Sequence, residues 1–338
     1  MDDNGHVRKD RGEPRGWWRV LGLVIAWGLM GVGAAFVLLY AVPEAQMWNR
    51  RLAMLAAFIP YGVLAWGGAA VLFALCARGF GKALALVALA GAILQLLWAS
   101  DYFPARSADA GGESSTVLTL NTRCVSYSDD DLVETLRDLQ PDLVVIQGTT
   151  VYLRDYLREQ GVEDAYPHRI FFPRGDSSTC ATAVYANEPL AEAAASTPDQ
   201  EAVSVRLNGT AAVLVPVDAP GPQAGVGPWN DALDLVGQVS ARAAQDGLPV
   251  IVAGDFNATR EHLPVRRLVG DGSLVDATAA SGSGWIPTFP ADRWHPAVIQ
   301  IDHVLVSPSL EVARVEAMRV GDNAHMGLVA RIRVAAGG

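Results

Sequence analysis

The chain begins with three apolar runs that contain no charged residue. They cover Val20–Pro43, Leu52–Ala77 and Ala83–Ser100, with short connections between them. A helix needs about 20 apolar residues to cross the hydrocarbon core of a bilayer. Three such helices inside a soluble domain would require a very large core, and a cleaved signal peptide would have a single, shorter run. The pattern therefore predicts a membrane domain with three transmembrane helices in residues 1–100.

The pattern changes after residue 115 to short apolar segments that alternate with amphipathic ones. Apolar residues at helical spacing predict helices over Asp129–Leu139, Val151–Gln160 and Asn230–Gln245. Runs of β-branched and apolar residues predict strands at Val117–Leu120, Leu143–Ile146, Ala181–Tyr185, Ala202–Leu207, Ala211–Val217, Val250–Ala253, Ile301–Val306 and Leu328–Val334. Strands and helices mixed in this order favour an α/β sandwich over a barrel.

These patterns divide the chain into three parts. Residues 1–100 form the predicted membrane domain, and residues 101–115, rich in Ser, Ala, Gly and Asp, are predicted to be a linker. Residues 116–338 are long enough to bury one large core of their own. We therefore expect one folded domain attached to a membrane anchor.

Charge is distributed unevenly over the 338 residues. Residues 1–100 hold nine of the 26 basic and five of the 36 acidic residues, a net charge of +4. The remaining 17 basic and 31 acidic residues give residues 101–338 a net charge of −14. An acidic surface repels an extended phosphate backbone, so no extended nucleic acid is expected as a partner. A narrow pocket that handles one phosphate is still compatible with this charge.

Basic residues before the first apolar run predict the orientation in the membrane. The cluster consists of Arg8, Lys9, Arg11, Arg15 and Arg19. Such clusters stay in the cytoplasm, so the N-terminus is predicted to be cytoplasmic, and three crossings place residues 101–338 outside it. Arg50 and Arg51 lie on the outer side in this arrangement. The predicted location is thus the cell membrane, as a multi-pass protein with an extracytoplasmic C-terminal domain.

Two of the three cysteines belong to the predicted soluble domain. Cys124 and Cys180 could form a disulfide if that side of the membrane is oxidising. Two independent buried thiols are equally compatible with the sequence. Cys76 falls in the second apolar run, where it is expected to act as a small apolar residue.

Polar residues that can carry chemistry lie at the ends of predicted strands. Asp255 and Asn257 lie in the four residues after the strand Val250–Ala253. Asp302 is the second residue of the strand Ile301–Val306, and His325 precedes the last strand. Carboxylates hold hard divalent cations, a cation polarises a phosphoryl group, and a histidine can transfer a proton. An Asx turn is the simpler interpretation of Asp255 and Asn257 alone. Together the residues suggest a metal-assisted phosphoester hydrolase.

Four segments in order carry a family resemblance. Val117–Asn121, Pro141–Gln147, Gly254–Thr259 and Ile301–Ser307 resemble the ordered motifs of the endonuclease/exonuclease/phosphatase superfamily, which has the DNase I-like fold. The resemblance covers residues 117–334 and is closest to bacterial members with N-terminal membrane spans. It implies a four-layer α/β/β/α sandwich and a metal-dependent phosphoester hydrolase.

The resemblance also implies roles for individual residues. Asn121 and Asp302 match positions near the metal, which would be Mg²⁺ or Mn²⁺ if the protein is active. Asp255 and Asn257 match the pair that orients the attacking water and the phosphate. His325 matches the histidine of the family's last motif.

Three positions depart from the family pattern. Gly148 stands where the family has its main metal-ligating glutamate, and Asp218 stands where it has a histidine. Ala324 replaces the aspartate before the last histidine, so nothing is expected to orient the imidazole of His325. Asp218 could serve as a displaced metal ligand or a carboxylic acid catalyst. These losses predict weak or lost hydrolase activity.

Two functions are compatible with these observations. The first is a membrane-anchored extracytoplasmic phosphoesterase that acts on a small or lipid-linked phosphoester beside the lipid bilayer. The second is a non-catalytic relative that retains the fold as a scaffold or interaction domain for a membrane protein partner. A transport function is disfavoured, because the apolar runs hold no charged residue.

Overall fold

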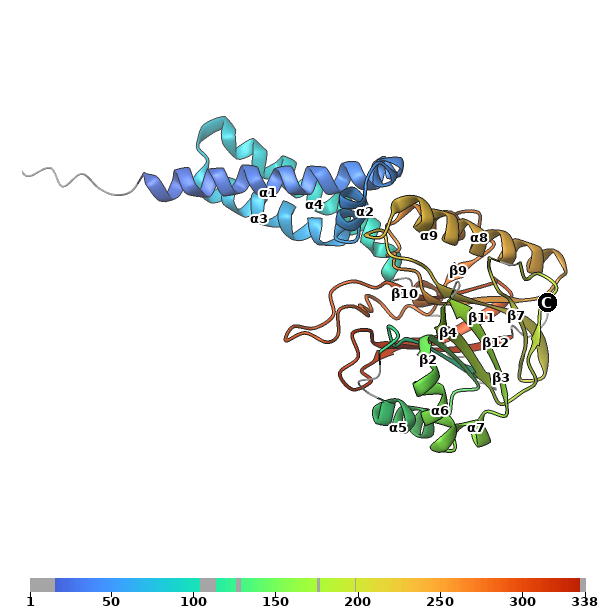
Figure 1. The fold of residues 1–338 in the computed structure, drawn as a ribbon. Helices are drawn as coiled ribbons and strands as arrows, with labels where there is room; N and C mark the ends of the chain where they lie inside the picture. The colour runs from blue at the N-terminus through green and yellow to red at the C-terminus, as the bar shows by residue number, and fades with distance from the viewer. Residues whose placement is uncertain (1–15, 104–113, 126–128, 175–176, 198, 335–338) are drawn as a thin grey trace, which may run out of the picture. The chain divides into compact units, whose positions relative to one another are not determined.

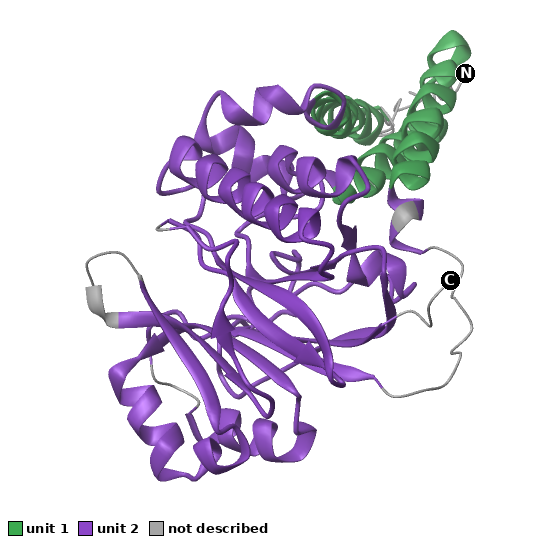
Figure 2. Cartoon of the chain, turned by 90° about the vertical axis from the view of Figure 1, so that its right-hand side faces the viewer, with its two compact units in different colours: residues 1–38, 60–98 green, residues 39–59, 99–338 purple. Residues whose placement is uncertain are grey.

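The computed structural model describes residues 16–103, 114–125, 129–174, 177–197 and 199–334. The chain divides into two units, one made of residues 1–38 and 60–98 and the other of residues 39–59 and 99–338 (Figure 2). The predicted linker lies for the most part outside the described residues, which resume at residue 114.

The first unit is built from apolar helices. It contains most of α1 (Trp17–Ala41), together with α3 (Gly62–Cys76), the 3₁₀ turn η3 (Gly79–Lys82) and α4 (Ala83–Ala99). Within this part of the chain, Trp17–Ala41, Ile59–Cys76 and Gly79–Ala99 are long and apolar enough to span a membrane.

Small residues let these helices approach closely. A Cβ atom built on Gly33 of α1 would lie 2.7 Å from the indole of Trp66 in α3, and one built on Gly91 of α4 would lie 2.5 Å from it. The two glycines therefore leave the space that the Trp66 ring fills, as small residues do at helix interfaces in membranes.

The second predicted span is shorter than the apolar run that suggested it. Residues 50–56 form a separate helix, α2 (Arg50–Ala56), which follows η1 (Pro43–Met47) and is capped by the side chain of Asn49. The chain then turns through η2 (Ile59–Tyr61), where Pro60 has no N–H to continue a helix. The run was predicted as one continuous span, and the structure corrects this.

The second unit is a four-layer α/β/β/α sandwich, as predicted (Figure 1). One sheet has the order β11 (Leu310–Met318), β12 (Gly327–Val334), β1 (Ser115–Asn121), β2 (Leu143–Thr150), β4 (Ser177–Ala186), β3 (His168–Arg174). The other has the order β5 (Ala191–Glu192), β6 (Val203–Leu207), β7 (Thr210–Asp218), β8 (Val250–Asp255), β10 (Asp302–Val306), β9 (Val275–Asp276).

Helices cover the outer face of each sheet. The first sheet is covered by α5 (Asp129–Leu139), α6 (Val151–Glu159) and α7 (Val162–Ala165). The second is covered by α8 (Val226–Gln245) and α9 (Leu263–Gly270), and the short α10 (Ala277–Ala280) follows β9. Leu132 and Leu157 pack on one outer face, and Leu233 and Val265 pack on the other.

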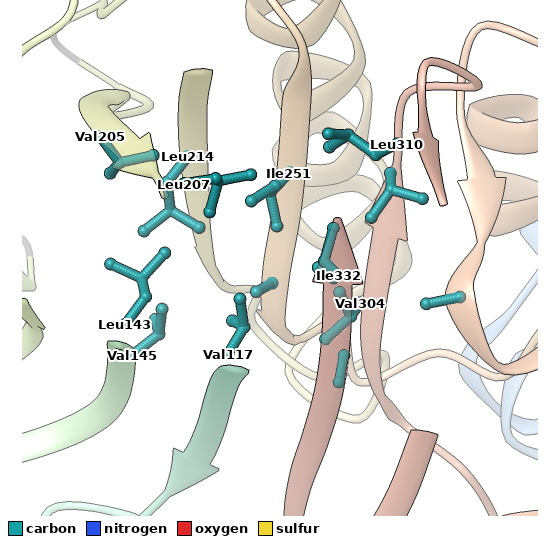
Figure 3. Close-up of a cluster of buried hydrophobic side chains, with 14 of the residues drawn as sticks. Val117, Leu143, Val145, Val205, Leu207, Leu214, Ile251, Val304, Leu310 and Ile332 are labelled. Atoms are coloured by element: carbon teal, nitrogen blue, oxygen red, sulfur yellow. The ribbon is translucent and has the colours of Figure 1, made fainter. Parts of the chain in front are cut away.

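The side chains of β8 alternate between the two faces of its sheet. In β8, Val250 and Val252 pack toward α8, whereas Ile251 and Ala253 pack between the two sheets (Figure 3). Side chains in a strand point to opposite faces with a period of two. The next residue in the inner series is Asp255, so the alternation directs its carboxylate between the sheets at the end of the strand.

Two longer strands, β3 and β11, and the two-residue strands β5 and β9 were missed from the sequence. β11 contains a bulge between Val312 and Arg314, which interrupts the period of two that identifies strands. β3 mixes polar and aromatic residues, and it pairs only with β4 at the edge of its sheet. The predicted helices and the other long strands are confirmed to within a few residues at their ends.

The loop between the first two candidate spans belongs to the sandwich. The buried amide of Gln46 donates to the carbonyl of Glu261 (3.1 Å) and accepts from the N–H of Leu263 (2.9 Å). A ring nitrogen of buried His262 lies 2.8 Å from the carbonyl oxygen of Ala53. The predicted boundary at residue 100 therefore needs correction, since a fragment starting at residue 101 would lose the partners of these buried groups.

Candidate active site

The predicted site residues converge at one end of the two sheets. In the antiparallel pair β8–β10, Asp302 lies directly opposite Asp255. Asn121 ends β1 in the other sheet, and its amide donates a hydrogen bond of 2.7 Å to Oδ2 of Asp255. His325 precedes β12, which pairs with β1. Residues far apart in the sequence thus meet because their strands end side by side.

The carboxylate of Asp255 is held by three donors. Besides Asn121, the backbone N–H of Asn257 donates to Oδ1 (2.7 Å), and the Asn257 amide donates to Oδ2 (3.0 Å). Asn257 has φ +48°, a left-handed conformation that asparagine tolerates better than most residues. The turn after β8 therefore fixes the orientation of a carboxylate that is only 1% exposed.

His325 has a carboxylate partner that the sequence did not suggest. Its Nδ1 lies 3.0 Å and 3.2 Å from the two carboxylate oxygens of Asp302, which is fully buried. The expectation that nothing orients this imidazole was wrong. The partner, Asp302, comes from β10, 23 residues earlier in the chain. The residue directly before His325, Ala324, therefore does not indicate whether the imidazole has a carboxylate partner.

The electrostatics of the group reflect its burial. Burial, and then repulsion from Asp302, raises the pKa of Asp255 to about 7, against the opposing effects of His325 and of the hydrogen bonds to Asn257 and Asn121. Burial alone would lower the pKa of His325, but the charge and hydrogen bond of Asp302 outweigh it and raise this pKa to about 9. Without a bound cation, the imidazole is therefore protonated at neutral pH.

Asp218 lies beside Asp255 but faces a different space. The two residues are neighbours in the parallel pairing of β7 and β8. Asp218 lines a cavity of about 590 Å³ together with Gln200 and Glu201, and neither Asp302 nor His325 lines this cavity. The described residues that gather as possible metal ligands are Asp255, Asp302 and His325, without Asp218.

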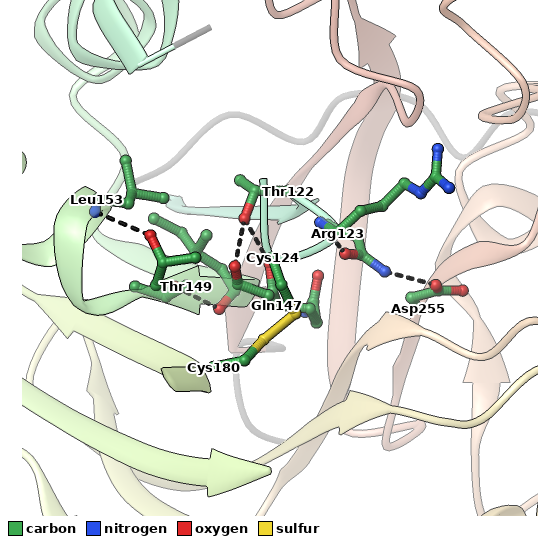
Figure 4. Close-up of a disulfide and its surroundings, with 12 residues drawn as sticks. Thr122, Arg123, Cys124, Gln147, Thr149, Leu153, Cys180 and Asp255 are labelled. Atoms are coloured by element: carbon green, nitrogen blue, oxygen red, sulfur yellow. Dashed lines mark hydrogen bonds between the residues drawn. A yellow bond between two sulfur atoms is a disulfide. The ribbon is translucent and has the colours of Figure 1, made fainter. Parts of the chain in front are cut away.

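Gly148 leaves no room for a side chain. It has φ +71°, and a Cβ atom built on it would lie 2.5 Å from the backbone nitrogen of Cys124 and 2.7 Å from that of Arg123. The hydroxyl of Thr122 donates to the carbonyls of Gly148 (2.8 Å) and Gln147 (3.0 Å). Residues 122–124, which we call the 122–124 turn and which Figure 4 labels, thus occupy the space that a side chain at position 148 would need.

A disulfide holds the 122–124 turn in place. The sulfur atoms of Cys124 and Cys180 are bonded at 2.01 Å, with Cα atoms 5.8 Å apart. Cys180 lies in β4, which pairs with β2, and β2 contains Gly148. The bond therefore ties the turn to the same sheet that it packs against.

The group of Asp255, Asp302 and His325 fits a divalent cation. Each residue offers one ligand atom, and these atoms lie within 4.8 Å of one another. Two carboxylates and an imidazole are donors that Mn²⁺ accepts, and Mg²⁺ is commonly held by one or two carboxylates with waters. Burial and the charge of Asp302 raise the pKa of Asp255, and a bound cation would oppose both effects.

Comparison with known proteins identifies the fold as that of the DNase I-like phosphoesterases. The sequence pattern of the endonuclease/exonuclease/phosphatase family matches residues 118–324, more than half of the chain. The chain therefore belongs to this family, whose members usually depend on divalent metals. No curated protein matches the sequence.

Several solved structures share the fold at low sequence identity. A family member from Bacteroides vulgatus is 18% identical, with a TM-score of 0.52 over 66% of this chain and 100% of its own. D. rerio TDP2 complexed with single strand DNA product is 14% identical, with a TM-score of 0.52 over 66% and 100%. The human Nocturnin catalytic domain with bound sulfate anion is 18% identical, with a TM-score of 0.50 over 66% and 95%.

The packing at Gly148 predicts that even an alanine at this position destabilises the protein. Gly148→Ala should lower the free energy of unfolding by about 1–3 kcal/mol, because a left-handed residue acquires a Cβ that meets the 122–124 turn. Thermal unfolding of the full chain in detergent measures this. Gly227→Ala in α8, where a Cβ meets no atom within 4 Å, is the matched control and should not destabilise. Equal stability of the two variants would contradict the packing argument.

The Asp302–His325 pair predicts a defined pH dependence. Because folding raises the pKa of His325 from 6.5 to about 9, its contribution to stability is full below about pH 6.5 and is lost as the pH rises through about 9. Asp302→Asn should lower the pKa of His325, since burial then acts without the opposing charge. NMR titration of the metal-free full chain measures the pKa of His325. The control is Asp234→Asn, which removes the acid of a partly exposed ion pair with Arg267. An unchanged titration in Asp302→Asn would refute the assignment.

Proposed function

We propose that the protein is a divalent-cation-dependent phosphoester hydrolase with slow turnover. The observation that carries the proposal is the buried group of Asp255, Asp302 and His325, with ligand atoms within 4.8 Å of one another, in a chain of this family. Asp255 and Asp302 would hold Mn²⁺ or Mg²⁺. When bound, the cation would polarise the phosphoryl group.

The protein residues have separate parts in the reaction. Asp255 orients a water molecule and takes its proton as the water oxygen bonds to phosphorus. Asn257 donates to Asp255 and so fixes its direction. His325 is cationic and held at Nδ1 by Asp302, so Nε2 gives its proton to the leaving oxygen as the phosphorus–oxygen bond breaks.

The filled position at Gly148 supports slow turnover. The site has one carboxylate fewer than the family pattern, so a cation is held by fewer protein ligands and should bind more weakly. Complete loss of catalysis would leave a scaffold or interaction domain for a membrane protein partner. The packing of the 122–124 turn over Gly148 is the observation that favours this second function.

The substrate we propose is a small or lipid-linked phosphoester near the bilayer. Support comes from three helices that could span a membrane and from the net charge of −14 on residues 101–338, which disfavours a nucleic acid strand. The proposed location is the cell membrane, with the sandwich outside the cytoplasm. The disulfide supports an oxidising compartment.

Hydrolysis of bis(p-nitrophenyl) phosphate by the full chain in detergent tests the function. Turnover should require Mn²⁺ or Mg²⁺, and Asp255→Asn should lower it by about 100-fold or more, because the water loses its base. The matched control, Asp234→Asn, changes a partly exposed aspartate of α8 and should retain activity. Absence of turnover with either cation, or full activity of Asp255→Asn, would reject the hydrolase and leave the scaffold.

Cysteine labelling tests the orientation. Gln238 is exposed on α8, Cys76 is buried, and the other two cysteines are bonded to each other. In intact cells, Gln238→Cys should react with a membrane-impermeant maleimide, whereas Asn4→Cys should react only after lysis. The reverse pattern would place the sandwich in the cytoplasm.

A further inference from the structure

Arg123 lies at the centre of an unusual turn. Arg123 and Cys124 have φ values of +56° and +58°, and such left-handed pairs are unfavourable for residues other than glycine. The surroundings hold the turn in this conformation. Oδ1 of Asn121 accepts the N–H of Arg123 (2.7 Å), the disulfide anchors Cys124, and Thr122 is buried with its hydroxyl on β2.

This turn connects Arg123 to the candidate active site. The side-chain oxygen of Asn121 accepts a hydrogen bond from the backbone N–H of Arg123. The nitrogen of the same amide donates to the carboxylate of Asp255 (Figure 4). Arg123 is also close enough to His325 for its charge to oppose the protonation of that imidazole. The 122–124 turn therefore fixes the backbone position from which the side chain of Arg123 extends.

The guanidinium of Arg123 is exposed and lacks an acidic partner. No carboxylate of the described residues lies within 4 Å of it, whereas other arginines of the sandwich, such as Arg169 and Arg314, form ion pairs with Glu163 and Glu316. A backbone conformation maintained by a disulfide and by buried hydrogen bonds thus presents a free positive charge beside the site. Strained backbone of this kind is typical of functional positions.

We propose that Arg123 is a binding subsite for one phosphoryl group of the substrate. The identity of the ligand, a phosphoester substrate, rests on the proposed function. The guanidinium binds two phosphoryl oxygens, supplying positive charge next to the position where Gly148 and the 122–124 turn exclude a metal-ligating carboxylate. Arginine suits this role because its charge is permanent and its planar fork matches two oxygens at once.

The surroundings of Arg123 favour a ligand with a single phosphoryl group. Arg123 lines a small cavity of about 50 Å³, whose wall also includes Asp129, Asp292 and Asp322. None of Asp255, Asp302 and His325 lines this cavity, so the proposed phosphoryl group lies outside it. The carboxylates on the cavity wall repel further phosphates, so an extended polyanion is disfavoured. The predicted ligand class is a compact phosphoester with one phosphoryl group.

Binding of inorganic phosphate tests the subsite without any turnover. The full chain in dodecyl maltoside with EDTA is titrated with inorganic phosphate by calorimetry. Arg123→Gln should weaken binding at least about tenfold, and Arg123→Lys should retain part of the affinity, since a charge remains without the fork. Arg137→Gln, which removes an exposed arginine of α5 that donates to the carbonyl of Gln160, should bind as the unmodified chain does. Thermal unfolding verifies that the variants are folded.

The outcomes separate the subsite from the proposed function. No phosphate binding by the unmodified chain, or equal binding by folded Arg123→Gln, overturns the subsite. Loss of binding in Arg123→Gln without detectable hydrolysis by the unmodified chain retains the subsite and rejects the hydrolase. Where hydrolysis is detected, Arg123→Gln should raise KM about tenfold, and an unchanged KM rejects only the subsite. A single-stranded oligonucleotide that displaces phosphate at equal concentration would overturn the single-phosphoryl assignment.

Discussion

The contact between the 122–124 turn and Gly148 determines which side chains can reach this site. A backbone nitrogen lies 2.5 Å from the Cβ atom that any other residue at position 148 would have, so no side chain fits there. The turn keeps this position because a disulfide, the buried Thr122 hydroxyl and the Asn121 side chain all hold it. Restoring a glutamate at position 148 would therefore require the turn to move.

Much of the fold was predictable because the period of two in buried strands is visible in the sequence. The apolar run of β8 predicted a strand, and the residue after it, Asp255, had to face the space between the sheets. The same alternation directs Asn121 and Asp302 inward from β1 and β10. Convergence of these three side chains follows from strand patterning, whereas the strand β11 escaped prediction because its bulge breaks the pattern.

Features that depend on distant contacts could not be predicted from local patterns. The pairing of His325 with Asp302 joins two strand ends, and no spacing rule in the sequence links them. The loop around Gln46 reads as a connection between two spans, yet its buried amide binds backbone groups at Glu261 and Leu263. Nor could the sequence show that Arg123 and Cys124 would fill the space above Gly148. The sequence showed that position 148 has no side chain, but not which residues would pack there.

The charged residues of the site largely balance one another. Asp255 and Asp302 can contribute two negative charges, and cationic His325 and Arg123 contribute two positive ones, so the group is close to neutral without any metal ion. A glutamate at position 148 would add a third negative charge and increase the need for a divalent cation. The positive charge of Arg123 instead adds to the neutralisation that the protein itself provides. The contact between the turn and Gly148 thus links the absence of a side chain at position 148 to the backbone position of Arg123.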